Sequence, residues 1–252
     1  MIFNDWLAAL ENRHFADLTF SEVNRALRAL SSTYVERRTR LKERGAFDSA
    51  GKRAAYALFY SPLHFLTVSL IVDALSLGTR PAKHIVDLGC GGGAAGAAWA
   101  SRLGPAARIT GIDAHPWALA EAALTYRLFG LDYDTRQGHA ARVTLPRSAD
   151  AVVAGWLLNE LDDASRSQVK ATLVAAARDG RQVLVVEPIA TRVSPWWKEW
   201  VRDLESLGGR ADEWRFPVEL PDVLVRLDRA AGMRHDVLKA RSLALGAPRR
   251  PS

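Results

Sequence analysis

The chain has 252 residues, of which 48% are hydrophobic and 25% are charged, and its formal net charge is +6. This composition allows a substantial buried core, as one large domain or as a domain with a helical extension, and excludes a largely disordered chain. The single cysteine excludes a disulfide framework and a cysteine-rich metal site, so we expect no metal centre. No N-terminal segment combines a basic start with a long apolar run, and we therefore expect a cytoplasmic protein.

Helix signals dominate the first 80 residues. Asn4 stands ahead of one helical segment, and Thr19 with Glu22 forms a capping box ahead of the next. Ser61-Pro62 is expected to cap and open a further helix, and the apolar stretch 63–77 that follows is interrupted by polar side chains. These interruptions indicate a buried helix, so we expect no membrane span.

The sequence after Pro81 alternates between predicted strands and helices. Strands are expected at residues 85–87, 108–113, 132–137, 150–155 and 183–188, helices at 195–207 and 220–231, and one or two closing strands at 236–245. The alternation predicts an α/β fold with a parallel sheet covered by helices on both faces. We therefore predict a helical region over residues 1–80 and a second domain over residues 81–252.

The most informative motif follows the first of these strands. Asp87 ends an apolar run, and Gly89, Gly91 and Gly93 follow at alternate positions, with Cys90 inside the turn. A strand that turns this tightly into a helix is typical of a site for a nucleoside-bearing cofactor. A carboxylate at Asp87 would repel the pyrophosphate of a dinucleotide, whereas it suits a sulfonium and an ammonium group. The motif therefore favours S-adenosylmethionine.

The motif resembles that of the class I methyltransferases, in which a strand ends with Asp or Glu and continues Gly-x-Gly-x-Gly. The resemblance implies a Rossmann-like, seven-stranded, mostly parallel sheet flanked by helices. Here that sheet would carry an N-terminal all-helical extension that covers or shapes the substrate entrance. The resemblance also implies S-adenosylmethionine as the cofactor and transfer of its methyl group to a nitrogen or oxygen acceptor.

A second acidic residue, Asp113, ends the next predicted strand. A carboxylate at that position can accept hydrogen bonds from both ribose hydroxyls, so we predict that Asp113 and the adjacent Ala114 bind the cofactor. Asp113 could also be the N-cap of the helix that opens at Pro116.

The later strand ends complete the expected site by resemblance. His139 and Ala140 occupy the place where members of the family contact the adenine edge, and Trp156 begins the loop after the fourth strand. The resemblance implies that all three bind the cofactor. That loop faces the methyl group and the substrate in the family, so Asn159 and Glu160 are the predicted catalytic residues. Glu160 could instead belong to the first turn of the next helix.

The acceptor is open between two chemical classes. Aromatic side chains that could stack on a planar acceptor, or pack in the core, follow the fourth and fifth strands at Trp156, Trp196, Trp197 and Trp200. A basic cluster that could contact an RNA backbone, or form an ordinary solvated helix face, comprises Arg37, Arg38, Arg40, Lys42 and Arg44.

The sequence also resembles, over residues 30–190, the methyltransferase-like proteins associated with the small ribosomal subunit. The similarity rests on Tyr34-Val35-Glu36-Arg37, on residues 54–62, on Leu158-Asn159-Glu160-Leu161 and on Glu187-Pro188. It implies RNA or the small ribosomal subunit as a partner, either for methyl transfer or for a non-catalytic assembly role. Together with the basic cluster, this similarity favours an RNA or ribosomal acceptor over a small planar molecule. With one cysteine in the chain, no iron–sulfur cluster is expected.

Overall fold

A computed structural model describes residues 2–36, 47–104, 106–189 and 194–246. The chain folds into two compact units. One unit combines Met1–His64 with Phe216–Leu238, and the other combines Phe65–Arg215 with Lys239–Ser252. Each unit takes two separate stretches of sequence, whereas the domains expected from the sequence, 1–80 and 81–252, are continuous. Those domain bounds stay a prediction.

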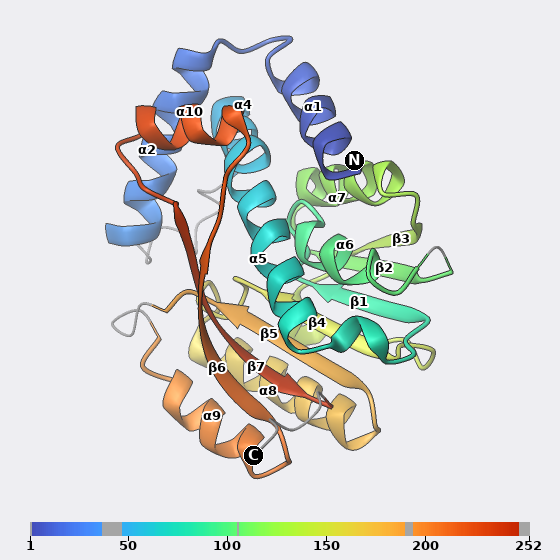
Figure 1. Cartoon of the computed structure of the whole chain (residues 1–252). Helices are drawn as coiled ribbons and strands as arrows, with labels where there is room; N and C mark the ends of the chain where they lie inside the picture. Colours follow the sequence, from blue (N-terminus) through green and yellow to red (C-terminus); the bar gives the residue numbers. More distant parts are fainter. Residues whose placement is uncertain (1, 37–46, 105, 190–193, 247–252) are drawn as a thin grey trace. The chain divides into compact units, whose positions relative to one another are not determined.

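The larger unit is organised around a seven-stranded sheet (Figure 1) in the order β3-β2-β1-β4-β5-β7-β6. Strands β1 to β5 pair in parallel, and β7 runs antiparallel to β5. The strands are β1 (His84–Leu88), β2 (Arg108–Asp113), β3 (Asp132–Gln137), β4 (Ala151–Gly155), β5 (Gln182–Glu187), β6 (Arg210–Pro217) and β7 (Val237–Leu245). The predicted Rossmann-like, mostly parallel sheet is confirmed. Sequence reasoning missed β6.

Helices cover both faces of this sheet (Figure 1). On one face lie α6 (Ala94–Ala100) and α7 (Pro116–Leu128), and on the other α8 (Asp163–Arg178) and α9 (Trp197–Glu205). Alternate strand residues such as Val86, Val152 and Val185 share one apolar core with Leu173 of α8 and Trp200 of α9. Short 3-10 turns, η2 (Leu77–Thr79) and η3 (Ala140–Arg142), lie in connections of the same unit.

The smaller unit is helical. It contains α1 (Ile2–His14), α2 (Phe20–Glu36), α4 (Ala50–Ala55), the π-helical turn η1 (Tyr56–Tyr60) and α10 (Asp222–Ala230). The predicted capping box is confirmed, because Thr19 N donates to Glu22 Oε2 (2.8 Å) and Glu22 N donates to Thr19 Oγ1 (3.3 Å). Asn24 and Arg28 of α2 both donate to the carbonyl oxygen of Ala230, at the end of α10. A segment from late in the chain thus joins the helices from its beginning.

The predicted helix start at Ser61-Pro62 agrees with the first residue of an α-helix, but the predicted capping role of Ser61 is wrong. Residues from Ala50 onward form one helical run into α5 (Ser61–Ala74), and Ser61 itself has helical angles, φ −57° and ψ −47°. Proline normally breaks a helix, because it lacks the N–H and crowds the preceding turn. Here the π-helical turn η1 precedes Pro62, and the Ser61 N–H bonds the carbonyl of Tyr56, five residues back. The wider turn accommodates the proline without ending the helix.

The run Ala50–Ala74 is long and apolar enough to cross a membrane, judged by length and composition alone. Of its most apolar window, 72% is buried inside the structure. The core helix of a soluble protein has the same properties.

The strand order places the expected site. From β1 the chain proceeds outward to β2 and β3, then returns to form β4 on the other side of β1. At such a reversal the connections leave the sheet in opposite directions and open a crevice beyond the carboxyl ends of the strands. The turn after β1 and the loop after β4 both lie at this position.

Candidate functional site

The turn after β1 depends on its glycines. Gly89, Gly91 and Gly93 have φ values of +70°, +50° and +79°, in the left-handed region that favours glycine. A Cβ at Gly89 would lie 2.5 Å from Cδ1 of Leu157, and one at Gly93 would lie 2.9 Å from the Cα of Ala122. Backbone conformation and close packing therefore both require glycine, and the bare backbone of the turn can approach a ligand.

Asp87 is directed into the protein. Its Oδ2 accepts hydrogen bonds from Gly96 N of α6 (2.9 Å) and from the Tyr126 hydroxyl of α7 (3.0 Å). The side chain is 1% exposed, and this burial raises the pKa of its carboxyl to about 7. Within the described residues, Oδ1 has no hydrogen-bond partner. Oδ2 therefore bonds α6 and α7 to the strand. A contact with the cofactor would involve Oδ1 and stays a prediction.

Cys90 is also buried, with 5% exposure, and burial raises the pKa of its thiol. Its backbone N–H donates to the carbonyl of Ile112 (3.0 Å), which joins the turn to β2. A contact between this residue and a cofactor would therefore involve its backbone.

Asp113 links the two cofactor segments predicted from the sequence. Its Oδ2 accepts from Gly91 N in the glycine turn (2.9 Å), and its Oδ1 accepts from His115 N (2.8 Å). Each carboxylate oxygen retains further acceptor capacity, so the half-buried side chain can still bind ribose hydroxyls. The alternative role as N-cap of α7 is wrong, because His115 is the cap and its Nδ1 accepts from Trp117 N (3.1 Å).

The residues expected near the adenine also follow strand ends. Ala114 is exposed, and its carbonyl accepts a hydrogen bond from the Gln137 side chain at the end of β3 (3.2 Å). His139 is exposed and caps η3 by accepting from Ala141 N (3.3 Å), while Ala140 is buried. Their contacts with a cofactor stay predictions.

The loop after β4 begins with an unusual conformation. Trp156 has a φ of +54°, which is uncommon for a residue with a bulky side chain. Its N–H donates to the carbonyl of Val186 in β5 (2.8 Å), so the loop continues the β4–β5 pairing while it turns. Such strained backbone clusters at ligand sites, and the predicted contact of Trp156 with the cofactor stays a prediction.

Asn159 lies in a hydrogen-bonded cluster that joins the ends of β4 and β5. Its Nδ2 donates to Glu187 Oε2, and its Oδ1 accepts from the Ser194 hydroxyl (2.6 Å). Glu187 is fully buried and also accepts from Leu158 N (2.7 Å). Burial raises the pKa of the Glu187 carboxyl to about 8, and the cross-strand neighbour Arg241 opposes this shift.

Sequence reasoning did not select Glu187 as a site residue. A signal was available, because Glu187 ends an apolar strand in the same way as Asp87 and Asp113 do. The pairing of Glu187 with the loop after β4 depends on strand order, which local sequence does not show.

Glu160 is exposed and lies in a turn before α8. The alternative placement in the first helical turn is wrong, because α8 begins at Asp163 and Asp162 is its N-cap, with Oδ1 accepting from Ser165 N (2.7 Å). The negative charge of Glu160 contributes to the raised pKa of Glu187. The catalytic role of Glu160 stays a prediction.

The tryptophans after β5 pack mainly in the core. Trp197 and Trp200 are 9% and 3% exposed and belong to the apolar core beneath α9. Trp196 is half-buried, with the Arg166 guanidinium 5.2 Å from its ring centroid. Core packing therefore accounts for two of these side chains.

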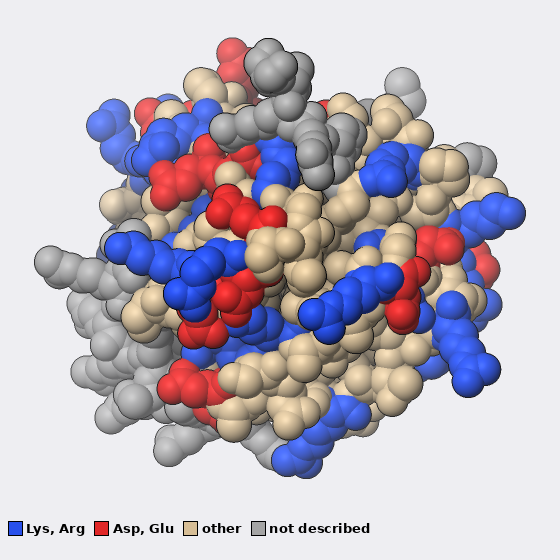
Figure 2. All heavy atoms as spheres, turned by 90° about the horizontal axis from the view of Figure 1, so that it is seen from below, with Lys and Arg blue, Asp and Glu red and all other residues tan. Residues whose placement is uncertain are grey.

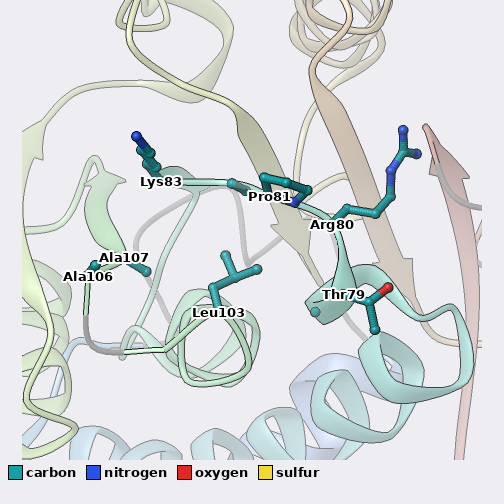
Figure 3. Close-up of a pocket in the computed structure, with 9 residues that line it drawn as sticks. Thr79, Arg80, Pro81, Lys83, Leu103, Ala106 and Ala107 are labelled. Carbon is teal, nitrogen blue, oxygen red and sulfur yellow. The ribbon is translucent and has the colours of Figure 1, made fainter.

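A hollow in the larger unit lies away from this site (Figure 3). It is lined by residues 78–83 with Leu103, Ala106 and Ala107, which precede β1 and β2. It is therefore at the amino ends of these strands, whereas the glycine turn and Asp113 are at their carboxyl ends. No group of three or more potential metal ligands occurs among the described residues.

The predicted RNA-binding cluster from Arg37 to Arg44 lies outside the described residues. On the face shown in Figure 2, Lys and Arg side chains are interspersed with Asp and Glu. That face has the mixed charge of an ordinary solvated surface.

Comparisons with known proteins agree with this geometry. Residues 85–180 match a family described as a methyltransferase domain. The chain is 36% identical over 121 residues to a ubiquinone biosynthesis O-methyltransferase of Stutzerimonas stutzeri (strain A1501), an alignment that covers 46% of this chain and 50% of that protein. The chain thus spans about half the length of this curated relative.

Two solved structures show the same fold. Mitomycin 7-O-methyltransferase is 16% identical, with a TM-score of 0.54 over 95% of this chain and 71% of the other. A proposed O-methyltransferase from Nostoc punctiforme PCC 73102 is also 16% identical, with a TM-score of 0.53 over 86% of this chain and 69% of the other. The narrower resemblance to ribosome-associated proteins stays a prediction. These findings support a class I, S-adenosylmethionine-dependent methyltransferase domain over residues 85–180.

Proposed function

We propose that the protein transfers the methyl group of S-adenosylmethionine to a hydroxyl oxygen of a small planar molecule. The observation that best supports methyl transfer is the hydrogen bond from Gly91 N of the glycine turn to Asp113 Oδ2, at the point where the strand order reverses. The oxygen acceptor is supported by the relative at 36% identity, whose name describes an O-methyltransferase of ubiquinone biosynthesis.

The residues where the strand order reverses, beyond the carboxyl ends of β1 and β4, fit this cofactor. Asp113 has acceptor capacity for two ribose hydroxyls, and the glycine turn leaves room for a ligand against the backbone. Asp87 keeps one buried oxygen without a partner in the described structure, which can accept a hydrogen bond from an ammonium group of the ligand, and the positive charge of that group would favour the ionised carboxylate. The bound cofactor would supply an electrophilic methyl group on a sulfonium.

The chain's own residues would align the acceptor and exclude water. In an in-line displacement the acceptor oxygen forms a bond to the methyl carbon as the carbon–sulfur bond breaks, and the hydroxyl proton leaves to a base or to solvent. Asn159 and Trp156 follow β4, and Leu157 between them packs against Gly89 of the glycine turn. In this proposal they orient the acceptor. Glu160, an exposed carboxylate that directly follows Asn159 in the sequence, could take the proton.

Binding and transfer test the proposal separately. We expect calorimetry to show micromolar binding of S-adenosylmethionine and no binding of NAD, and Asp113→Ala to weaken the former by about 1.5 to 3 kcal/mol through lost charge-assisted hydrogen bonds. Asp134→Ala is a matched control, because that carboxylate lies on β3 and pairs with Arg136. Tight NAD binding, or unchanged affinity in Asp113→Ala, would contradict the assigned cofactor site.

The acceptor class is tested with tritiated methyl donor. Catechol, total cellular RNA and a protein extract are offered in parallel, and we expect label in catechol. Label in RNA alone would overturn the small-molecule acceptor and favour the ribosomal alternative. Cofactor binding with label in none of the three pools would favour a non-catalytic role.

A further inference from the structure

The loop after β4 is held from two sides. Glu187 of β5 accepts from Leu158 N (2.7 Å), and Arg166 of α8 donates from Nε to the Leu158 carbonyl (2.9 Å). A further Arg166 nitrogen donates to the carbonyl of Leu161. The N–H and the C=O of Leu158 are therefore both hydrogen-bonded to side chains of neighbouring elements, in the loop that follows β4.

This support extends to one functional side chain. The Asn159 carboxamide lies between Glu187, which accepts from its nitrogen, and Ser194, which donates to its oxygen at 2.6 Å. Glu187 and Ser194 are 0% and 3% exposed, whereas Asn159 is half-buried. In the arrangement seen here both Glu187 oxygens accept, as in the ionised carboxylate, and reversing the amide would then set two acceptor oxygens against each other. The ionised side chain therefore fixes the orientation of the amide.

We propose that Glu187 is a positioning residue, which holds Asn159 so that the second N–H of its carboxamide is offered to the acceptor hydroxyl oxygen. An amide nitrogen carries two N–H donors, and the described contacts occupy one of them. A donor held in a single orientation would direct an oxygen lone pair at the methyl carbon, which is the alignment that an in-line transfer needs. This inference rests on the proposed oxygen acceptor.

The test compares three variants of the full chain with catechol as the acceptor probe. Glu187→Gln replaces one acceptor oxygen by a donor nitrogen, so the bonds to Leu158 N and Asn159 Nδ2 cannot both be kept. We expect kcat/KM for catechol to fall by about 10-fold to 100-fold, with the Kd of S-adenosylmethionine unchanged. Ser194→Ala should give a smaller fall, because the contact to Glu187 still sets the amide.

The double variant Asn159→Asp with Glu187→Gln separates positioning from a general structural role. In it the introduced glutamine can accept from Leu158 N and donate to the introduced carboxylate, so the hydrogen bonds of the loop are restored while the N–H donor is lost. We expect its Tm to return toward the wild-type value and its kcat/KM to stay low.

Several results would overturn the inference. Wild-type kcat/KM in Glu187→Gln would remove Glu187 from the reaction, and full recovery in the double variant would show that only loop shape matters. A wild-type protein that binds S-adenosylmethionine but leaves catechol unmethylated would overturn both the acceptor class and this inference, while the methyltransferase domain stands. Absence of S-adenosylmethionine binding would instead be a failure of the proposed function itself.

Discussion

At the scale of single residues, carboxylates at strand ends have different tasks. Asp113 accepts from the backbone of two loops, and Glu187 accepts from the loop after β4. Asp87 bonds a backbone N–H of α6 and the Tyr126 hydroxyl of α7. The three acidic residues thus bond the sheet to different loops and helices. The burial of Asp87 and Glu187 raises the pKa of their carboxyls and so favours their uncharged forms.

The buried carboxyl of Asp87 should make stability depend on pH. Its folded pKa, about 7, lies above the ordinary value of 3.8, so the protonated form is preferred in the folded protein. The corresponding stability is fully present below the ordinary value and is lost as pH rises through about 7. In Asp87→Asn, which cannot ionise, this loss should be absent.

Urea unfolding of the cofactor-free protein at pH 5 and pH 8 measures this effect. We expect the free energy needed to unfold Asp87→Asn, relative to wild type, to be larger at pH 8 than at pH 5, because only wild type loses stability over this range. Asp132→Asn is the control, because Asp132 is exposed at the start of β3. An equal difference at both pH values would contradict the raised pKa.

At the scale of elements, the β1–α6 turn combines backbone conformation with close packing. Gly93 has a φ of +79°, and a Cβ there would lie 2.8 Å from Tyr126 Cε1 and 2.9 Å from the Cα of Ala122. Gly104 has a φ of +91°, and a Cβ there would meet nothing in the described structure within 4 Å. The two glycines therefore separate backbone strain from crowding.

Replacing each glycine by alanine should destabilise the protein to different extents. Gly104→Ala should cost about 1 to 2 kcal/mol, the penalty of a left-handed backbone with a Cβ. Gly93→Ala should cost about 1 to 3 kcal/mol more, because helix α7 must also move away from the turn. Urea denaturation measures both losses of stability. Equal losses would contradict the prediction, because they would mean that α7 moves away from the added Cβ at no energetic cost.

At the scale of the whole molecule, the prediction of an RNA partner rests on the basic cluster from Arg37 to Arg44, which lies outside the described residues. If Arg37, Arg38 and Arg40 contact RNA, binding should weaken steeply with salt, because each neutralised phosphate releases a counterion. Replacing all three by glutamine should then lower RNA affinity and flatten the salt dependence, without changing the Kd of S-adenosylmethionine. A small-molecule enzyme should show neither effect.

Gel-shift titrations at two salt concentrations measure this difference between wild type and the triple variant. Replacing Arg226, Arg229 and Arg234 by glutamine is the matched control, since it removes the same charge from the α10 region. Absence of RNA binding by wild type at low salt would leave the small planar acceptor as the supported class.

Local sequence was sufficient for much of the sheet and of the cofactor turn. The succession of β1 to β5 along the chain, the glycines after β1 and the acidic strand ends all follow from short-range patterns: apolar runs, turn residues and helix caps. These patterns are readable because backbone conformation at a turn is decided within a few residues.

Longer-range features required the tertiary structure. Strand β6 is a polar strand next to β7 at the edge of the sheet, and it becomes recognisable only through its partner. The helix that continues through Pro62 and the joining of α10 to the N-terminal helices depend on contacts between distant segments. The same holds for Glu187 and Asn159, which are 28 positions apart in sequence and meet because β4 and β5 are neighbours. Composition and periodicity describe what each segment can become, whereas the pairing of segments selects which side chains meet at the site, because burial and hydrogen bonding there are satisfied only by the whole fold.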